Sequence, residues 1–370
     1  MRIAIDARKL HDYGIGTYVR NLLRQLSRLD GDNEYIAICR PDDVTLVKGL
    51  GENFLAVAET APPYSIREQI KLPLDLRRAR ADLFHAPHYV LPPLTPCRSV
   101  VTIHDVIHLR FPEYLPNRAA HTYARAMIWL AIRRADRVLT VSEASKRDIL
   151  RYFNVSSGKV EVIPNAIDDR FGMAPSDEEV AQVRERYQLH APFLLYAGNI
   201  KPHKNIERLI EAFGQLRRRG FDKVKLLIIG DQVTKYAALR HAVHRCKLHT
   251  HVRFFGFVPD RMLAVLYRLA DAFVFPSLYE GFGLPPLEAM ASGTPVVTSN
   301  VSSLPEVVGD AALLVDPYDV MAIADALERV LTDEALRHDL VTRGLARAKE
   351  FSWERSVRRI REVYQEVSAR

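Results

Sequence analysis

The sequence lacks the features of a membrane-spanning or disulfide-stabilised protein. None of its apolar runs approaches the roughly eighteen residues that a transmembrane helix needs. Cysteine is rare: Cys39, Cys97 and Cys246 are scattered, without the spacing of a metal site or a disulfide framework. A strand-like segment begins at Arg2, so we expect no signal peptide. These absences predict a protein with reduced thiols in the cytoplasm.

Two ligand-binding signatures are also incomplete. Gly14 and Gly16 follow the strand-like residues 2–7, but a third glycine is missing, so the dinucleotide-binding fingerprint is absent. The glycines suit either close approach of a ligand or a tight turn. Asp30-Gly31-Asp32 has the Asp-x-Asp form of a metal motif, yet it precedes a predicted strand, at the edge where parallel sheets do not bind ligands. We therefore interpret it as a turn.

The histidines do not supply a metal site either. His85 and His88, or His104 and His108, are close enough in sequence to form pairs. No third ligand accompanies either pair, whereas zinc sites use three or four protein ligands. The prediction is that the protein holds no metal.

The composition is that of a soluble globular protein with a basic balance. Apolar residues make up 48% and charged residues 26%, and 370 residues suffice for two ordinary domains. The formal net charge is +7, with a pI near 9.2. This charge suits anionic partners such as nucleotide phosphates, anionic lipid or nucleic acid, and does not choose among them.

Strand-like and helix-like segments alternate twice along the chain. The first series ends at residues 159–163, and a Pro-Asn turn at 164–165 follows; the second series starts at residue 193. Such alternation predicts two doubly wound parallel α/β sheets. We expect an N-terminal domain at 1–165, a C-terminal domain at 166–350 and a final helical segment at 351–370.

Residues 279–288 have the strongest functional pattern. They read Tyr-Glu-Gly-Phe-Gly-Leu-Pro-Pro-Leu-Glu, between a buried strand and a helix. The free N–H groups near Gly283 and Leu284, at the helix start, favour a phosphate. Glu280 and Glu288 flank this position and suit the hydroxyls of a hexose and a ribose. The alternative is a solvated loop carboxylate and a carboxylate favoured by the helix dipole.

A phosphate between two carboxylates requires a cation. Lys204 follows the strand-like residues 193–198 and would supply it.

The spacing Glu-x7-Glu around Phe-Gly resembles the signature of the retaining glycosyltransferases of family 4, which have the GT-B fold. That resemblance implies two Rossmann-like domains facing across a cleft, with the final helix returning to the N-terminal domain. It further implies that Glu280 contacts the donor hexose, Glu288 the ribose and His104 the donor sugar. The implied catalytic residues are therefore His104, Lys204 and Glu280. The implied donor-binding residues are Gly16, Asn199, Lys204, Gly230, Val258, Asp260, Glu280, Phe282, Gly283, Leu284 and Glu288.

One departure from the family concerns the diphosphate. Relatives usually carry arginine where this chain has Asn199, and Lys201 is a candidate substitute.

The resemblance predicts a retaining, metal-independent transferase that uses a nucleoside-diphosphate sugar and no cofactor. The chain resembles bacterial mannosyltransferases of polysaccharide assembly. Its Asp260 lies where guanine-using relatives have a carboxylate. GDP-mannose is thus the expected donor; Asp260 as a helix N-cap, and a UDP- or ADP-sugar, are the alternatives. A non-catalytic protein that binds nucleotide or nucleic acid is the rival function.

The expected acceptor is a glycan or a lipid-linked saccharide. The basic stretches at 77–80 and 118–134 predict contact with an anionic membrane. We therefore expect a peripheral location at the inner face of the plasma membrane, and no nucleic-acid partner.

Overall fold

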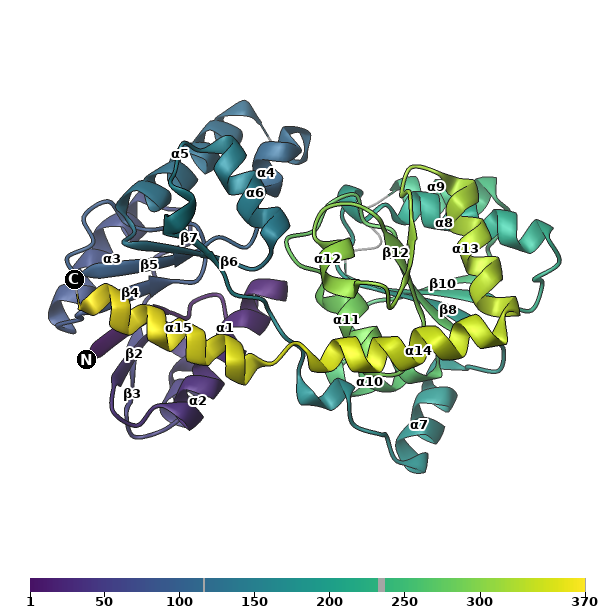
Figure 1. Cartoon of the computed structure of the whole chain (residues 1–370), viewed down its shortest axis with the longest axis horizontal. Coiled ribbons are helices and arrows are strands. Elements are labelled where there is room, and N and C mark those ends of the chain that lie inside the picture. Colours follow the sequence, from purple (N-terminus) through teal and green to yellow (C-terminus); the bar gives the residue numbers. More distant parts are fainter. Residues whose placement is uncertain (116, 232–236, 370) are drawn as a thin grey trace. The chain divides into compact units, whose positions relative to one another are not determined.

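The computed structural model describes residues 1–115, 117–231 and 237–369 (Figure 1). The chain forms two compact units, one of Met1–Ala166 with Ser352–Arg370 and the other of Ile167–Phe351. Each is a parallel α/β unit, so the predicted fold class is confirmed. The functional division expected between 1–165 and 166–350 remains a prediction. Among the described helices, none has both the length and the apolar character needed to cross a membrane.

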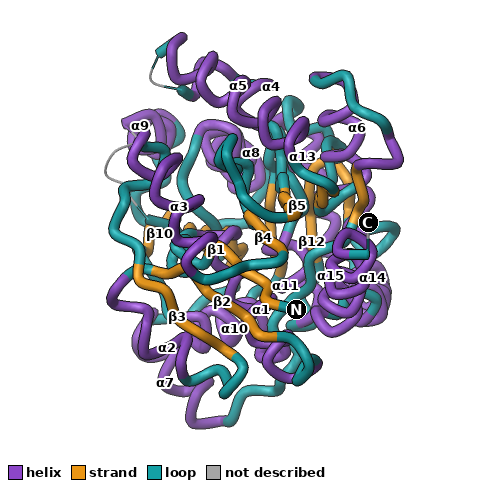
Figure 2. The backbone as a smooth tube through the Cα atoms, turned by 90° about the vertical axis from the view of Figure 1, so that its left-hand side faces the viewer, coloured by secondary structure: helices purple, strands orange, loops and turns teal. Residues whose placement is uncertain are grey.

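The first unit is built on a parallel sheet with seven strands among the described residues, in the order β3-β2-β1-β4-β5-β6-β7. Its strands are almost continuously apolar because helices cover both faces. Figure 2 distinguishes the helices (purple) from the strands (orange). The strands are β1 (Arg2–Asp6), β2 (Glu34–Cys39), β3 (Phe54–Ala58), β4 (Leu83–Ala86), β5 (Arg98–Thr102), β6 (Arg137–Thr140) and β7 (Val160–Val162).

Polar caps fix where several helices of this unit begin. Ser65, Asn117 and Ser142 each accept a hydrogen bond from the backbone amide three residues further on. The helices are α1 (Tyr13–Leu29), α2 (Val44–Lys48), α3 (Ile66–Arg78), α4 (Ile107–Arg110), α5 (Arg118–Arg134) and α6 (Glu143–Tyr152).

The predicted turn at Asp30 is present. The Asp30 carboxylate accepts bonds from the amides of Asp32 (3.0 Å) and Asn33 (3.2 Å) and from the Tyr35 hydroxyl (2.8 Å). These bonds hold the connection between α1 and β2.

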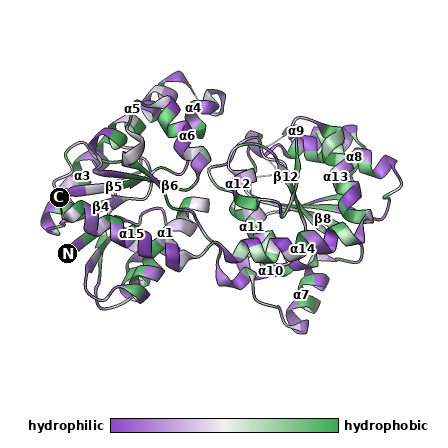
Figure 3. Ribbon diagram, in the orientation of Figure 1, coloured by the Kyte–Doolittle hydropathy of each residue, from purple (hydrophilic) through white to green (hydrophobic). Residues whose placement is uncertain are grey.

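The last helix, α15 (Trp353–Ser368), completes the first unit, as predicted. Its apolar residues recur every three or four positions and are buried, whereas the residues between them are largely polar, as the mixed colours in Figure 3 show. The Tyr364 hydroxyl lies 2.6 Å from Nδ1 of His85 on β4, and Arg361 donates to the carbonyl of Leu29 at 2.9 Å. Residues more than 270 positions apart thus share one core.

The second unit has a parallel sheet in the order β10-β9-β8-β11-β12-β13. The strands are β8 (Phe193–Ala197), β9 (Lys225–Ile229), β10 (Val252–Phe255), β11 (Ala272–Phe275), β12 (Val296–Ser299) and β13 (Leu313–Val315). The helices are α7 (Asp177–Tyr187), α8 (Ile206–Arg218), α9 (Ala237–Arg245), α10 (Asp260–Leu269), α11 (Leu284–Ala291), α12 (Leu304–Val308), α13 (Val320–Thr332) and α14 (Glu334–Lys349).

The strand order reverses once in each sheet, between β1 and β4 and between β8 and β11. At such a switch point the loops after the two strands diverge to opposite faces and leave a crevice at the carboxyl edge, where open α/β sheets bind ligands. In the second unit these loops comprise residues 198–205 and 276–283, which contain Lys204 and Glu280. The topology therefore brings the predicted cation and the first carboxylate to one edge.

Candidate active site

Lys204 and Glu280 form an ion pair at the switch point of the second sheet. Lys204 Nζ lies 2.6 Å from Glu280 Oε1, and the two side chains are only 10% and 13% exposed. Asn205 ties their loops together by donating to the carbonyl of Pro276 at 3.0 Å, and the amide of Leu278 donates to the carbonyl of His203 at 2.7 Å. The predicted cation and carboxylate are thus direct neighbours.

Two serines hold the loop that carries Glu280. The Ser302 hydroxyl donates to the Glu280 carbonyl at 2.6 Å and accepts from the Glu280 amide at 3.2 Å. Ser303 donates to the carbonyls of Glu280 (3.0 Å) and Phe282 (2.6 Å). Ser302 itself has a φ of 60°, a strained conformation for a residue other than glycine. The loop is therefore fixed from a segment about twenty residues further along the chain.

The start of α11 is suited to an anion. Gly283 precedes it with a φ of 120°, a conformation open to glycine, and no described side chain caps this helix end. Leu284 is the first helical residue, and Pro285 and Pro286 lack N–H groups of their own. The N–H groups of Gly283 and Leu284 are therefore the ones left without a carbonyl partner inside the helix. A negatively charged group in front of Leu284 would gain from these amides and from the helix dipole.

Glu288 lies one turn into α11 and is half-buried. The Tyr267 hydroxyl donates to its Oε2 at 3.1 Å. Burial raises the pKa of Glu288 to about 7, and the negative charge of Asp260 adds to this, against the opposing effects of the Tyr267 bond and Arg170. A carboxyl that is partly protonated near neutral pH has too few hydrogen-bond donors around it to keep it ionised. Ribose hydroxyls would supply such donors.

This pKa makes stability depend on pH. In the unfolded chain Glu288 loses its proton near pH 4.5, but in the folded chain only near 7. Between these values the folded state binds one more proton, so the free energy of unfolding falls as pH rises, by up to about 3 kcal/mol. We expect urea unfolding to show that Glu288→Gln removes this component, so that the variant gains on the wild type from pH 5 to pH 7.5. Glu185→Gln, at an exposed site of the same unit, is the matched control; an equal stability difference at both pH values would contradict the assignment.

The structure contradicts the alternative that Asp260 is a helix N-cap. It is the first residue of α10, and Pro259 occupies the cap position, so Asp260 is not an N-cap. Its carboxylate instead pairs with Arg170 Nη1 at 3.0 Å, and Arg170 Nη2 also contacts Asp168 at 2.8 Å. The pairing of Arg170 with Asp260 could not be predicted from local sequence, because ninety residues separate the two. Recognition of guanine by Asp260 remains a prediction, and it would compete with this ion pair.

Several other predicted donor residues are closely packed in the second unit. A Cβ on Gly230 would lie 2.2 Å from the Gly198 carbonyl oxygen, so only glycine fits there. Val258 is buried, and the Phe282 ring packs edge-on against Phe351 with centroids 5.6 Å apart. A donor contact from Phe282 would therefore come from its backbone. Contact of these residues with the donor is still a prediction.

Asn199 and Lys201 differ in environment. Within the described chain, the Asn199 Oδ1 atom is buried and has no hydrogen-bond partner, whereas Lys201 is exposed. A buried polar atom without a partner is costly unless a ligand or water satisfies it. The structure thus keeps Asn199 as a candidate for donor contact, and Lys201 remains the candidate cation.

His104 and Gly16 belong to the first unit. His104 follows β5; its Nε2 lies 2.9 Å from the Pro87 carbonyl, and its ring packs edge-on against Tyr18 at 4.9 Å. Burial lowers the pKa of His104, which favours the neutral ring. Gly16 lies inside the first turn of α1, and not in a turn before it. A Cβ there would be 2.5 Å from the Leu10 carbonyl oxygen, so close packing already requires this glycine.

Two of the histidines considered for metal have other partners. His85 lies between Tyr364 and the Thr102 hydroxyl (2.8 Å), and burial lowers its pKa to about 3. His88 accepts from the Val90 amide at 3.2 Å through Nδ1, and its Nε2 is 3.3 Å from Asp6. These bonds give both rings structural partners within the first unit.

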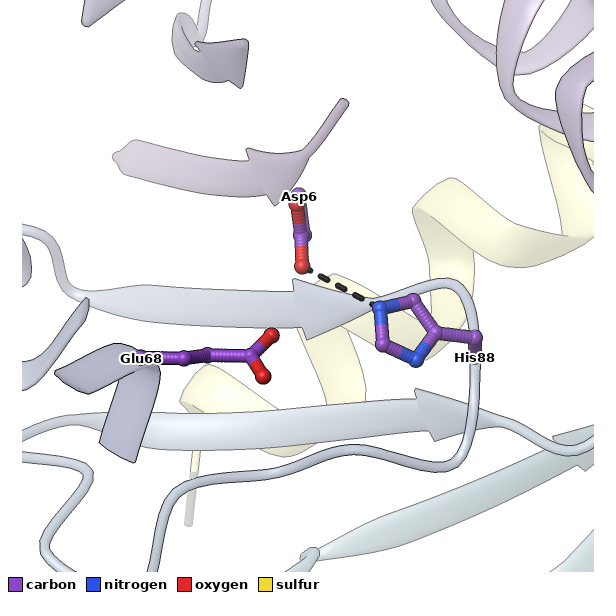
Figure 4. Close-up of side chains that lie close together, drawn as sticks. All are labelled: Asp6, Glu68 and His88. Atoms are coloured by element: carbon purple, nitrogen blue, oxygen red, sulfur yellow. Dashed lines mark hydrogen bonds and ion pairs between the residues drawn. The ribbon is translucent and has the colours of Figure 1, made fainter. Parts of the chain in front are cut away.

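One group of described residues has the geometry of metal ligands: Asp6, Glu68 and His88, with ligand atoms within 4.8 Å of one another (Figure 4). Arg8 lies between the two carboxylates, at 2.6 Å from each, and is 3% exposed. Its guanidinium already supplies the positive charge that these carboxylates need. The group stands at the switch point of the first sheet as a buried ion-pair network.

Comparison with known proteins agrees with this fold and motif. A family model described as "Glycosyltransferase Family 4" matches residues 13–171, and one described as "Glycosyl transferases group 1" matches residues 178–347. The chain is 39% identical over 280 residues to the O-antigen chain mannosyltransferase B of Escherichia coli, with 75% of this chain and 73% of that protein covered. It is also 33% identical over 273 residues to the serotype-specific mannosyltransferase WbdA of the same organism. That alignment covers 70% of this chain but only 32% of WbdA.

Solved structures show the same architecture. Sucrose-phosphate synthase from Thermosynechococcus elongatus superimposes with a TM-score of 0.81 at 24% identity, over 100% of this chain and 99% of that one. HepE from Anabaena in complex with UDP-glucose gives 0.80 at 19% identity, over 99% and 100%. The family models and the mannosyltransferase relatives define this chain as a glycosyltransferase. The chain belongs to glycosyltransferase family 4 and has the GT-B fold.

Proposed function

We propose that this glycosyltransferase moves mannose from GDP-mannose to a glycan or lipid-linked saccharide during cell-surface polysaccharide synthesis. Mannose as the transferred sugar is supported by the Escherichia coli relative, an O-antigen mannosyltransferase by name, at 39% identity. The observation that carries the chemistry is the Lys204–Glu280 pair beside the uncapped start of α11. A diphosphate leaving group would gain its stabilisation there from the lysine and the helix amides, and we propose that no metal or other cofactor is required.

The proposed reaction retains the configuration at the anomeric carbon. The acceptor hydroxyl attacks from the face on which the diphosphate leaves, and the departing phosphate oxygen takes the acceptor's proton. The sugar–phosphate bond breaks as the new glycosidic bond forms. In this scheme Glu280 orients the hexose, Glu288 binds the ribose and His104 contacts the sugar.

A UDP-sugar is the alternative donor, and one observation favours it. Asp260, the residue proposed to recognise guanine, is engaged by Arg170 at 3.0 Å. A uracil base would make no demand on Asp260, whereas guanine has to compete with or rearrange this pair.

A ligand screen separates these donors. A ligand at 100 times its dissociation constant stabilises the folded protein by about 2.7 kcal/mol, which raises a thermal midpoint by several degrees. We expect GDP and GDP-mannose to raise the midpoint more than UDP, ADP or their sugars at equal concentration. A larger shift with UDP would select the alternative donor, and no shift with any nucleotide would contradict both.

We further propose that the enzyme works peripherally at the cytoplasmic face of the plasma membrane. The support is the pair of basic stretches at 77–80 and on α5, which carry positive charge that anionic lipid attracts. Nucleic acid is not a proposed partner.

A further inference from the structure

Arg170 lies near both of the carboxylates that we expect to bind the nucleoside. Asp260 is the predicted contact of the base, and Arg170 Nη1 donates to its Oδ2 at 3.0 Å. Glu288 is the predicted contact of the ribose. Burial raises the pKa of Glu288, and the positive charge of Arg170 is one of the effects that oppose this rise. One guanidinium therefore interacts with both predicted nucleoside contacts.

Asp168 sets the position of this guanidinium. Its Oδ2 accepts from Arg170 Nη2 at 2.8 Å, and its Oδ1 accepts from the Arg170 amide at 3.2 Å. The hydrogen bond to Asp168 is the largest of the effects that raise the pKa of Arg170, ahead of the charges of Asp260 and Glu288. Arg170 is thus held by its own turn, and its orientation does not depend on Asp260 alone.

The next residue fixes this turn to the two helices that carry the carboxylates. Phe171 is buried, and its ring packs edge-on against Tyr267 of α10 with centroids 5.8 Å apart. The Phe171 carbonyl accepts from the hydroxyl of Ser292, just after α11, at 3.1 Å. Tyr267 in turn donates to Glu288. The fold therefore places Arg170 on a support that it shares with both predicted nucleoside contacts.

The pair of Arg170 and Asp260 is open to a ligand. The two side chains are 40% and 55% exposed, so their ion pair adds little to the free energy of unfolding. Arg170 contacts Oδ2 of the carboxylate, and each carboxylate oxygen can accept two hydrogen bonds. Nη1 carries two N–H groups, and the bond to Asp260 needs one of them. The pair thus offers hydrogen-bond acceptors and a donor side by side.

The nucleotide bases differ in how well their edges match such a pair. Guanine has two neighbouring donors, N1–H and the N2 amino group, next to the acceptor O6. The donors suit a carboxylate, and the acceptor suits a guanidinium. Uracil has one donor between two carbonyl oxygens, so one oxygen would face the carboxylate. Adenine would turn the acceptor N1 to the carboxylate and the N6 donor to the guanidinium, so both contacts would be repulsive.

We infer that Arg170 is a second residue that recognises the base: its Nη1 donates to O6 of guanine while the Asp260 carboxylate accepts from N1–H and N2–H. The inference rests on the proposed function, because it takes a guanine nucleotide as the donor, and it adds a specificity-determining residue. It also removes the competition between guanine and Arg170 for Asp260. Oδ2 can accept from both, so the pair is rearranged without being broken.

Calorimetric titration of the full chain with GDP, inosine diphosphate, UDP and ADP tests this role. Inosine diphosphate keeps O6 and N1–H but lacks the N2 amino group. Arg170→Gln removes the charged donor, and Arg170→Lys keeps the charge without the planar fork. Arg184→Gln, at an exposed arginine of α7 in the same unit, is the matched control. Thermal midpoints without ligand show whether each variant folds.

We expect the wild type to bind GDP most tightly and ADP most weakly. Arg170→Gln should weaken GDP and inosine diphosphate by the same factor, about tenfold or more, because both bases carry O6. Its affinity for ADP should be unchanged or higher, since a repulsive contact with N6 is removed. Arg170→Lys should lie between Arg170→Gln and the wild type, and Arg184→Gln should match the wild type.

Three results would overturn the inference. Tighter binding of GDP by Arg170→Gln would show that Arg170 competes for Asp260 and does not contact the base. Equal losses for GDP and ADP would show a structural role, and unchanged affinities would show no role in binding. Failure of the proposed donor is visible in the wild type alone, as tighter binding of UDP than of GDP. It is therefore distinct from a wild type that prefers GDP and whose preference Arg170→Gln leaves unaltered.

Discussion

Replacing Lys204 with alanine is expected to lower kcat/KM for glycosyl transfer by about a hundred- to a thousandfold. The lysine is 10% exposed and bonded to Glu280 at 2.6 Å, so it is held at the switch-point crevice by the fold. Its ammonium would balance the charge that builds on the departing diphosphate. Without it, Glu280 remains as a nearly buried carboxylate that repels the same phosphate. The lost positive charge and the new repulsion both lower kcat/KM.

Steady-state rates with the nucleotide sugar measure this loss. Lys223→Ala, an exposed lysine of the same unit, is the matched control and should have wild-type rates. Because breaking a buried pair also destabilises the protein, thermal midpoints are recorded beside the rates. The double variant Lys204→Ala/Glu280→Ala should recover stability but not turnover. A single variant that folds and keeps wild-type turnover would remove Lys204 from the reaction.

The two glutamates are expected to fail in different ways. If Glu288 binds ribose, Glu288→Ala should weaken nucleoside diphosphate and intact donor alike, by about ten- to a hundredfold, because a carboxylate that accepts hydroxyl hydrogen bonds is lost. Glu280 should contact the hexose alone. Glu280→Ala should therefore leave diphosphate affinity nearly unchanged and lower turnover, since orientation of the hexose matters most in the transition state.

The structure also predicts the direction in which diphosphate affinity changes in each variant. Glu280→Ala frees Lys204, so diphosphate affinity should stay equal or rise, whereas Glu288→Ala leaves the Tyr267 hydroxyl without its acceptor. Calorimetric titration with the diphosphate, together with initial rates with the full donor, tests both variants. Equal losses of diphosphate affinity would show that the two roles are assigned wrongly.

Much of the fold follows from local sequence. Apolar runs such as Phe193–Ala197 and Ala272–Phe275 are short enough for buried parallel strands, and a glycine precedes α11 as the pattern predicts. For the final helix, the family resemblance predicts its place on the first unit. Its contact between Tyr364 and His85 spans 279 positions, and no local pattern reports such a pairing.

The same contrast between local patterns and long-range contacts applies to the candidate site. The roles expected of Glu280 and Glu288 rest on a motif of ten residues, and the role expected of Lys204 rests on its position in the loop after a strand. Sequence did not indicate that Ser302 and Ser303 fix the Glu280 loop, or that Arg170 holds Asp260, because these are long-range side-chain contacts.

The proposed reaction is a retaining transfer of mannose from GDP-mannose that needs no metal. The most direct measurement incubates the purified protein with GDP-α-mannose and a saccharide acceptor in EDTA, then determines the anomeric configuration of the product by NMR. We predict an α-mannosyl product at an undiminished rate. A β-linked product, or turnover that EDTA abolishes and Mg²⁺ or Mn²⁺ restores, would contradict the roles given to Lys204 and the start of α11.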